Sequence, residues 1–115
     1  MKTVDRFRDE FRFLSNFYPA PFKTEDAREW PTSEHAFQAA KTRSLTDQET
    51  IRRMATPGKA KRAGRRIEIR TDWERIKLRT MFRLLTLKFQ QNPDLARKLR
   101  ETTTKHTQHL SLIHI

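Results

Sequence analysis

The sequence predicts a single α+β domain that is mostly helical, with a small β element in its N-terminal third. Three observations support this prediction. Helix start and stop signals recur from residue 31 to residue 93. Strand-like alternation of apolar and polar residues is confined to residues 4–30. At 115 residues the chain is long enough for one hydrophobic core, and no internal linker or repeat divides it.

The β element is expected to be short and interrupted. Aromatic residues alternate with polar ones over residues 11–17, which is typical of a half-buried strand. Two prolines end that pattern, and residues 22–24 begin a second short strand before an acidic turn at residues 25–26. We expect this element to pack on the helix that begins at Trp73.

Three short helices are expected to follow. Thr32 or Ser33 caps a helix that runs to about Thr42. The sequence from Thr46 to Glu49 reads as a capping box and opens a helix through Met54. Residues 56–64 form another, because proline suits the first helical position and glycine the end of a helix.

The longest helix is expected to be central. Residues 71–74 read as a second capping box after a brief extended link at residues 67–69, and the helix runs to about Gln91. Its apolar positions form a broad face rather than one stripe, which indicates burial on several sides. Residues 92–93 then restart a last helix.

The charge of the chain is +11, and most of it lies in one segment. Residues 52–88 hold 13 lysines and arginines against three acids and therefore carry +10. Such a block attracts phosphate, either of a nucleic acid or of a small nucleotide-like substrate. Equally, the same charges can simply keep two helices in solution. Composition alone leaves these alternatives open.

Other classes of protein do not fit the composition. The chain has no cysteine, which excludes disulfides and thiolate metal sites, and we expect no metal or cofactor. The first 12 residues lack the apolar core of a secretory signal. No apolar run approaches the ~20 residues that span a bilayer. We therefore expect a cytoplasmic protein without a membrane partner, and the oligomeric state is open.

The richest segment chemically is residues 30–41, Trp-Pro-Thr-Ser-Glu-His-Ala-Phe-Gln-Ala-Ala-Lys. Glu34, Phe37, Gln38 and Lys41 follow helical spacing and share one face. A face that alternates an aromatic ring with ionisable groups suits a pocket wall. The alternative is an ordinary solvated face, with Glu34 favoured by the helix dipole alone.

Residues 13–17, Phe-Leu-Ser-Asn-Phe, followed by residues 30–41 resemble the YbiA-like, or NADAR, domain family. Weaker matches follow in the family's order at residues 57–65, 72–73, 81, 88–89 and 92–93. The resemblance implies an N-glycosidase that cleaves a ribosyl C1′–N bond in a ribose-phosphate or ADP-ribose-type substrate. A riboflavin precursor and ADP-ribosylated guanine are the two substrate variants.

The resemblance also indicates residue roles. Glu34 stabilises charge at C1′ or activates water, and Lys41 acts as a proton donor or as a Schiff-base nucleophile. The expected substrate-binding residues are Ser15, Asn16, Ser33, Gln38, Trp73 and Arg65, with Arg62 and Arg66 as further phosphate candidates. Each has a structural alternative: a turn for the loop residues, core packing for Trp73, and solvation for the arginines.

Two further expectations concern the class of protein and the end of the chain. A non-catalytic nucleotide, ADP-ribose or nucleic-acid binding module is the alternative function. Residues 110–115 match the translation of a transposase adapter, and the family's Trp-Gly and Asn-x-Leu-Gly motifs are absent. We therefore expect an incomplete domain at residues 4–103, poorly soluble or inactive, with an unstructured or artefactual tail at 104–115. Its histidines, His106, His109 and His114, are not expected to bind metal.

Overall fold

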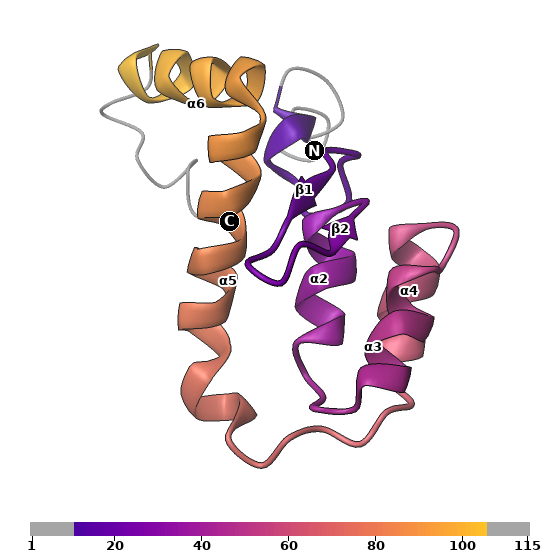
Figure 1. Cartoon of the computed structure of the whole chain (residues 1–115). Helices are drawn as coiled ribbons and strands as arrows, with labels where there is room; N and C mark the ends of the chain where they lie inside the picture. Colours follow the sequence, from indigo (N-terminus) through magenta and orange to yellow (C-terminus); the bar gives the residue numbers. More distant parts are fainter. Residues whose placement is uncertain (1–10, 106–115) are drawn as a thin grey trace, which may run out of the picture.

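A computed structural model describes residues 11–105 and confirms a mostly helical α+β fold with one small sheet (Figure 1). The domain boundary predicted near residue 103 and the three C-terminal histidines fall at or beyond the end of the described residues. The elements, in chain order, are η1 (Arg12–Leu14), β1 (Phe22–Lys23), β2 (Glu29–Trp30), α2 (Ser33–Ala39), α3 (Leu45–Arg52), α4 (Pro57–Gly64), α5 (Trp73–Gln91) and α6 (Pro93–Lys105).

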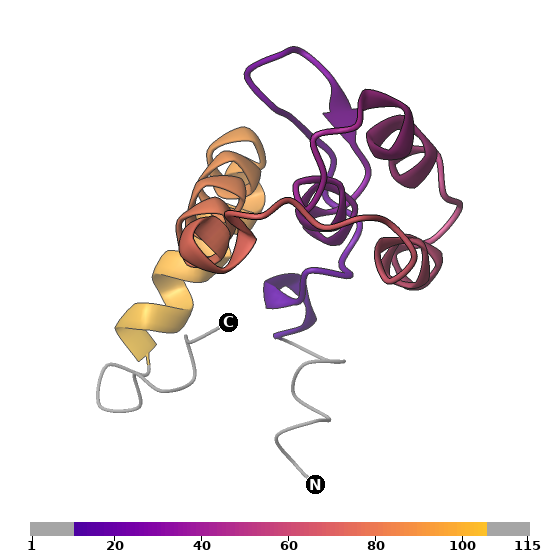
Figure 2. The ribbon, with the colours of Figure 1, turned by 90° about the horizontal axis from the view of Figure 1, so that it is seen from below.

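The central element is α2, although it is only seven residues long. It packs against α3 and α4 on one side and against α5 on the other (Figures 1 and 2). Six of its seven residues are buried, because three of them are small or aliphatic and the others are held by hydrogen bonds. The residues predicted to carry chemistry therefore lie on the most enclosed helix of the domain.

The prediction that the longest helix is central was wrong. Helix α5 lies along one side of the domain, and only one narrow stripe of it is buried (Figure 2). The apolar breadth of its sequence is explained by side chains that remain in solvent, since Leu78 is 81% exposed and Phe82 is 74% exposed. The buried stripe consists of Trp73, Ile76, Thr80, Leu84 and Lys88.

The apolar core consists of two clusters. The larger one joins the sheet to α2, α3, α4 and α5, and its buried members are Phe22, Trp30, Ala36, Ala39, Ile51, Ala60 and Leu84. The smaller one lies where η1 meets α6, and its buried members are Phe13, Leu14, Ala20 and Leu95. Because burial of such side chains is the main stabilising term in folding, these clusters determine how η1 and α2 are placed against α5.

Residues 11–17 do not form the strand that the aromatic alternation predicts. The backbone N–H of Leu14 donates to Phe11 O at 3.0 Å and that of Ser15 to Arg12 O at 3.0 Å, so the segment is a 3₁₀ turn. Phe13 and Leu14 are adjacent and both buried, which a strand with one buried face does not allow.

The predicted second strand is present as β1, and its partner β2 was not predicted. The two strands are antiparallel, with Phe22 opposite Trp30 and Lys23 opposite Glu29. The sheet packs on α5 as expected. The amide of Gln91 fixes this contact, because its Nε2 donates to Lys23 O at 2.8 Å and its Oε1 accepts from Lys23 N at 2.7 Å.

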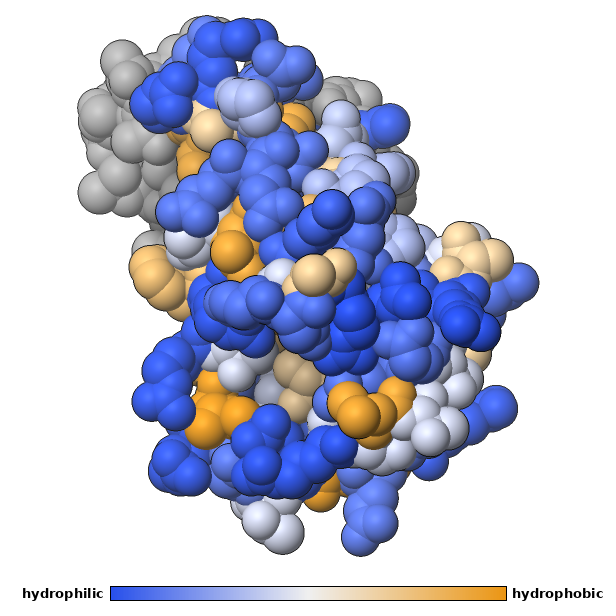
Figure 3. Space-filling model, in the orientation of Figure 1, coloured by the Kyte–Doolittle hydropathy of each residue, from blue (hydrophilic) through white to orange (hydrophobic). Residues whose placement is uncertain are grey.

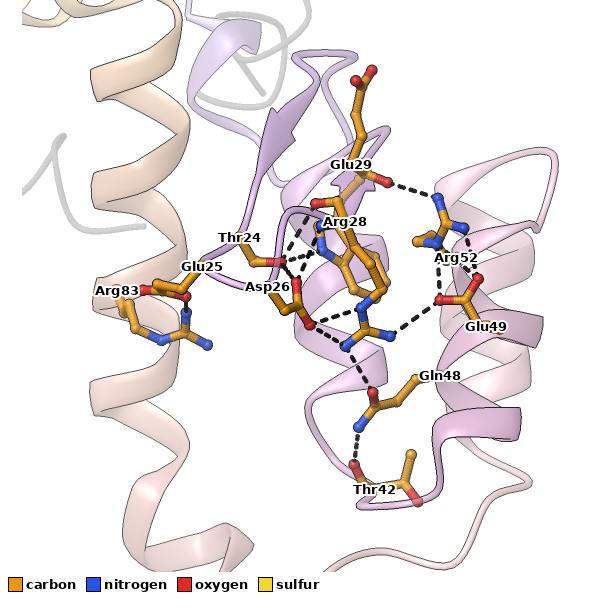
Figure 4. Close-up of polar contacts among 11 residues, drawn as sticks. Thr24, Glu25, Asp26, Arg28, Glu29, Thr42, Gln48, Glu49, Arg52 and Arg83 are labelled. Atoms are coloured by element: carbon orange, nitrogen blue, oxygen red, sulfur yellow. Dashed lines mark hydrogen bonds and ion pairs between the residues drawn. The ribbon is translucent and has the colours of Figure 1, made fainter.

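A charged network ties the hairpin to α3 (Figure 4). Arg28 bonds Asp26 at 2.8 Å, Glu49 at 3.1 Å and the side chain of Gln48 at 2.9 Å, and its guanidinium lies over the ring of Trp30. Hydrogen bonds from Thr24 and then Arg28 lower the pKa of Asp26 to about 2, and hydrogen bonds from Arg52 and then Arg28 lower that of Glu49 to about 2. Both carboxylates are therefore charged at neutral pH, and the hairpin is held against α3.

Two predicted capping boxes are not formed. Helix α3 begins two residues earlier than predicted, because Ser44 rather than Thr46 is its cap and accepts from Asp47 N at 3.2 Å. The N-cap of α5 is Asp72, which makes no side-chain cap bond. Its carboxylate is paired instead with Arg70 and, at 3.1 Å, with Arg43.

The caps of α2 and α4 are as predicted. Thr32 caps α2 by accepting from His35 N at 3.1 Å, and Thr56 caps α4 by accepting from Lys59 N at 3.1 Å. The face shown in Figure 3 is mostly hydrophilic, with small separate hydrophobic patches. No helix within residues 11–105 is long and apolar enough to cross a membrane.

Candidate active site

The candidate site is built around a buried carboxylate. Glu34 lies in the first turn of α2 and is only 6% exposed. Gln38, one turn further along, is also buried, and its Nε2 donates to Glu34 Oε2 at 2.6 Å. The helical spacing that suggested a shared face therefore places these two side chains in direct contact, and the amide fixes the orientation of the carboxylate.

The other end of the Gln38 amide has no partner. Its Oε1 is buried and accepts no hydrogen bond within the described structure. This oxygen lies against Gly64, where α4 crosses α2, and a Cβ built on Gly64 would lie 2.0 Å from it. The absence of a side chain at Gly64 is thus what gives the Gln38 amide its place beside Glu34.

Lys41 lies near Glu34, although it is not in the helix. Helix α2 ends at Ala39, earlier than the predicted Thr42, because the last N–H groups form tighter bonds, Lys41 N to Gln38 O at 3.2 Å and Thr42 N to Ala39 O at 3.2 Å. Burial lowers the pKa of the Lys41 amine. The charge of Glu34 opposes that shift, whereas neighbouring cations add to it.

Those cations come from two other elements. Lys61 and Arg65 belong to α4 and to the turn after it, and Lys77 belongs to α5. All three are close enough to Lys41 to act on its charge, and Lys41 in turn is close enough to feel the charge of the buried Glu34 carboxylate. Lys61 and Lys77 were not predicted as site residues, because nothing in their own segments distinguishes them from other surface lysines.

The loop residues Ser15 and Asn16 are brought to the start of α2. Asn16 Oδ1 accepts from Ser33 Oγ at 2.9 Å, and Asn16 O accepts from Glu34 N at 3.1 Å. The hydroxyl of Ser15 accepts from Phe17 N at 3.0 Å, which is an ordinary serine turn. Ser33 is completely buried. The hydroxyl of Ser33 therefore joins the helix to the loop, and the hydroxyl of Ser15 shapes the loop itself.

The amide nitrogen of Asn16 is the polar group of this loop with the weakest protein contact. Its Nδ2 reaches only Met81 Sδ, at 3.7 Å. A thioether sulfur is a weak acceptor. Asn16 is therefore the loop residue with a hydrogen-bond donor to spare for a ligand.

Trp73 and Arg65 lie in contrasting environments. Trp73 is 4% exposed, and its ring packs against Phe37 at 5.1 Å between centroids. The indole is therefore part of the packing that holds Phe37 of α2 against α5. Arg65 is exposed at the end of α4, as are Arg62 and Arg66. Of these three, Arg65 is the one whose charge reaches Lys41.

His35 is a packing residue, as the sequence suggested. It is 1% exposed, and its Nδ1 lies 2.8 Å from Thr32 Oγ1. Its Nε2 donates to Met54 O at 3.0 Å, because a carbonyl oxygen can only accept. The imidazole therefore joins the start of α2 to the chain after α3, and both ring nitrogens are occupied.

A cavity of about 220 Å³ lies on the opposite side of α2 and has no residue in common with the predicted site. Its polar side chains are already paired with one another, as Figure 4 shows for Arg28 and Asp26 and for Arg83 and Glu25. It therefore offers few free groups for a ligand. It is lined by Thr24, Glu25, Asp26, Arg28, Trp30, Ala36, Ala39, Ala40, Gln48, Arg83 and Leu84.

The arrangement around Glu34 is suited to acid–base chemistry next to an anion. A buried carboxylate can stabilise a developing positive charge or remove a proton from water, and a neighbouring amine of lowered pKa can supply one. Within residues 11–105, no group of three or more histidine or acidic side chains is placed to hold a metal ion. The fold and the site thus define a small α+β domain with a carboxylate–amine pair in a cationic setting.

The chain belongs to the NADAR domain family, whose model matches residues 4–111. It is 40% identical over 89 residues to the N-glycosidase YbiA of Escherichia coli strain K12, which covers 76% of this chain and 55% of that protein. It is 37% identical over 92 residues to the riboflavin biosynthesis protein VVA0006 of Vibrio vulnificus, covering 78% of this chain and 25% of that one.

A solved structure confirms the fold. The NMR structure of the E. coli protein YbiA is similar to this one with a TM-score of 0.72 at 40% identity, over 83% of this chain and 56% of that chain. The chain therefore spans about half the length of the YbiA proteins that it matches. The predicted resemblance to the YbiA-like family is confirmed.

Proposed function

We propose that this protein is an N-glycosidase that hydrolyses a ribosyl C1′–N bond in a ribose-phosphate or ADP-ribose-type substrate. The observation that carries the proposal is the buried Glu34 carboxylate, oriented by Gln38 and close to Lys41, whose charge is in turn influenced by three further cations. The relatives named N-glycosidase YbiA share 40% identity with this chain, which supports the reaction class. The substrate is a riboflavin precursor or ADP-ribosylated guanine.

Each part of the site has a role in this reaction. As the C1′–N bond breaks, positive charge develops at C1′, and a carboxylate close to it lowers the barrier. Water then adds its oxygen to C1′, and its proton goes to the leaving nitrogen. Glu34 stabilises the charge or activates the water, and Lys41 protonates the nitrogen or attacks C1′ of the opened sugar.

The cationic side chains near Lys41 bind the phosphate group of the substrate. Lys61, Arg65 and Lys77 are close enough to Lys41 to lower its pKa, and a bound phosphate would offset that repulsion. Arg65 offers a planar fork that matches phosphate oxygens. Asn16, with its weakly bonded amide, is placed to donate to a ribose hydroxyl.

An assay of product release tests the proposal. The full chain is incubated with a ribosylamine phosphate and, separately, with ADP-ribosylated guanosine, and the free base or amine and the free sugar are separated by chromatography. We expect equal amounts of base and sugar from one of the two substrates. Release of neither, by a folded chain that binds the substrate, would contradict the enzymatic function and favour a binding module.

A second candidate, a nucleic-acid binding module, is favoured by one observation. Helix α4 and the turn after it carry five exposed cations, none of which forms an ion pair with a residue of the described structure. Several arginines of other elements do pair with acids, as Arg28 and Arg52 do. The unpaired cations, which we call the α4 basic face, are Lys59, Lys61, Arg62, Arg65 and Arg66.

Salt dependence tests this candidate. If the α4 basic face contacts phosphates of a single strand, the logarithm of the binding constant falls linearly with the logarithm of the salt concentration. The slope is about 0.7 per phosphate contacted. Replacing Lys59, Arg62 and Arg66 with glutamine is then expected to reduce the slope by about 2. The control is the same change at Arg97, Lys98 and Arg100 of α6, which removes an equal charge. Equal effects of the two triple variants would indicate net charge alone and rule out a docking face.

A further inference from the structure

Lys88 is a lysine inside the domain without a carboxylate partner. It lies near the end of α5, and its side chain is completely buried. Its Nζ donates to Phe13 O at 3.0 Å and to Ser15 O at 3.1 Å, and it lies 5.2 Å from the centre of the Phe89 ring. None of the ion pairs among the described residues includes it.

Burying an amine costs free energy because the charged group loses its hydration, and the same desolvation lowers its pKa. Desolvation lowers the pKa of Lys88 to about 8. A methionine or leucine would fill the same space without this penalty. The amine donates to two carbonyl oxygens of one turn: Phe13 O accepts no backbone N–H within the described residues, and Ser15 O accepts one other donor, the Tyr18 N–H at 3.1 Å. A neutral amine has two N–H donors, so both bonds survive in either protonation state.

The turn that Lys88 holds is directly connected to Glu34. Asn16 follows Ser15 in the chain, and its carbonyl oxygen accepts the Glu34 backbone N–H at 3.1 Å. Its side-chain oxygen accepts from Ser33 Oγ at 2.9 Å. A continuous series of hydrogen bonds thus runs from α5 through residues 13–16 to the first turn of α2.

We propose that Lys88 is a positioning residue of the candidate site, which sets the position of Glu34 by fixing the 13–16 turn from α5. The other anchors of this turn are less exact, since Phe13 and Leu14 pack in an apolar cluster without directional bonds and Asn16 Nδ2 makes only a weak contact with Met81 Sδ of α5 at 3.7 Å. The Lys88 amine supplies directional hydrogen bonds to Phe13 O and Ser15 O. The inference concerns the position of Glu34, and its importance for catalysis rests on the proposed function.

The test uses hydrogen exchange of two neighbouring amides. The N–H of Glu34 is bonded to Asn16 O, in the turn that Lys88 holds, whereas the N–H of His35 is bonded to Thr32 Oγ1 within the same helix end. In Lys88→Met we expect the Glu34 amide to exchange at least tenfold faster while the His35 amide keeps its rate. The control is Lys98→Met, which also removes one charge from a lysine next to Phe13, but an exposed one.

Three outcomes are informative. Selective loss of protection at Glu34 in Lys88→Met, and not in Lys98→Met, supports the proposal. Equal loss at both amides would show that Lys88 only stabilises the domain, and no loss at either would show that the turn is held without it; both results overturn the proposal. If Lys88→Met does not fold, Lys88→Leu, which also lacks N–H donors, is measured instead with the same criteria.

The measurement does not depend on turnover. An inactive wild-type chain with the selective exchange effect would reject the proposed glycosidase and keep the positioning role. An active chain in which Lys88→Met changes neither the exchange of the Glu34 amide nor kcat would keep the proposed glycosidase and reject the positioning role of Lys88. If both hold, Lys88→Met lowers kcat with little change in KM, because the carboxylate and not the phosphate contacts is displaced.

Discussion

Replacing Glu34 with glutamine is expected to reduce turnover by about 10²–10⁴-fold, which is the usual contribution of a positioned acid–base group. The change removes the negative charge that opposes the charge at C1′ and keeps the shape of the side chain. The new amide oxygen still accepts the hydrogen bond from Gln38, which now measures 2.6 Å to the carboxylate. Substrate binding is therefore expected to change little, and kcat should fall much more than KM rises.

The stability of Glu34→Gln is expected to stay close to that of the wild type. Glu34 is 6% exposed, so neutralising it relieves a buried charge while the neighbouring Lys41 loses its opposite charge, and the two effects oppose each other. The matched control is Glu74→Gln, the same change in the first turn of α5 at a carboxylate that is 83% exposed. Release of free base is measured for both variants. If Glu34→Gln releases base at the same rate as Glu74→Gln, Glu34 has no part in catalysis and only interacts favourably with the dipole of its helix.

The sequence was sufficient for most of the helices and for the core of the site. The capped start of α2 and the spacing of Glu34 and Gln38 are local properties, since neighbours one turn apart on a helix meet wherever the helix lies. The same holds for Thr56 and Pro57, which mark the start of α4 by their own backbone preferences, whereas Gly64 is its last residue without a positive φ and serves the contact with Gln38. Lys41 was placed near Glu34 by an argument that assumed a longer helix, and a turn brings it there instead.

The errors concern residues whose position depends on distant partners. Alternation at residues 11–17 predicted a strand, but these residues meet α5 and α6 rather than a second strand. The capping box predicted at residues 71–74 is not formed, because the N-cap is Asp72 and its carboxylate pairs with Arg70 and Arg43 from outside the helix. The apolar residues of α5 suggested a central helix, although Leu78 and Phe82 face solvent. A pattern in one segment does not reveal which of its faces finds a partner.

Replacing Gly64 with alanine is expected to destabilise the domain by about 2 kcal/mol or more, because overpacking a close contact has this order of cost. The new Cβ would lie 2.0 Å from Gln38 Oε1 and 2.8 Å from its Cδ. Neither atom can move easily, since Gln38 is buried between the two helices and bonded to Glu34. The amide must leave its place, and the carboxylate loses the donor that orients it.

Gly58→Ala provides the matched control for Gly64→Ala. Both glycines belong to α4, but a Cβ at Gly58 meets nothing closer than Thr56 Oγ1 at 3.9 Å. Alanine is the better helix former by up to about 1 kcal/mol, so Gly58→Ala is expected to raise the free energy of unfolding. The two substitutions are thus identical in chemistry and opposite in predicted sign, and chemical denaturation of each variant measures the difference.

The double variant Gly64→Ala/Gln38→Ala separates the contact from the backbone effect. Removing the Gln38 amide removes the two nearest atoms, so the double variant is expected to be more stable than Gly64→Ala alone, a coupling that a double-mutant cycle measures directly. It should not regain turnover, because Glu34 then lacks its donor altogether. Additive effects of the two substitutions would mean that Gly64 is required by the crossing of α4 over α2 as a whole, and that the orientation of Glu34 is set elsewhere.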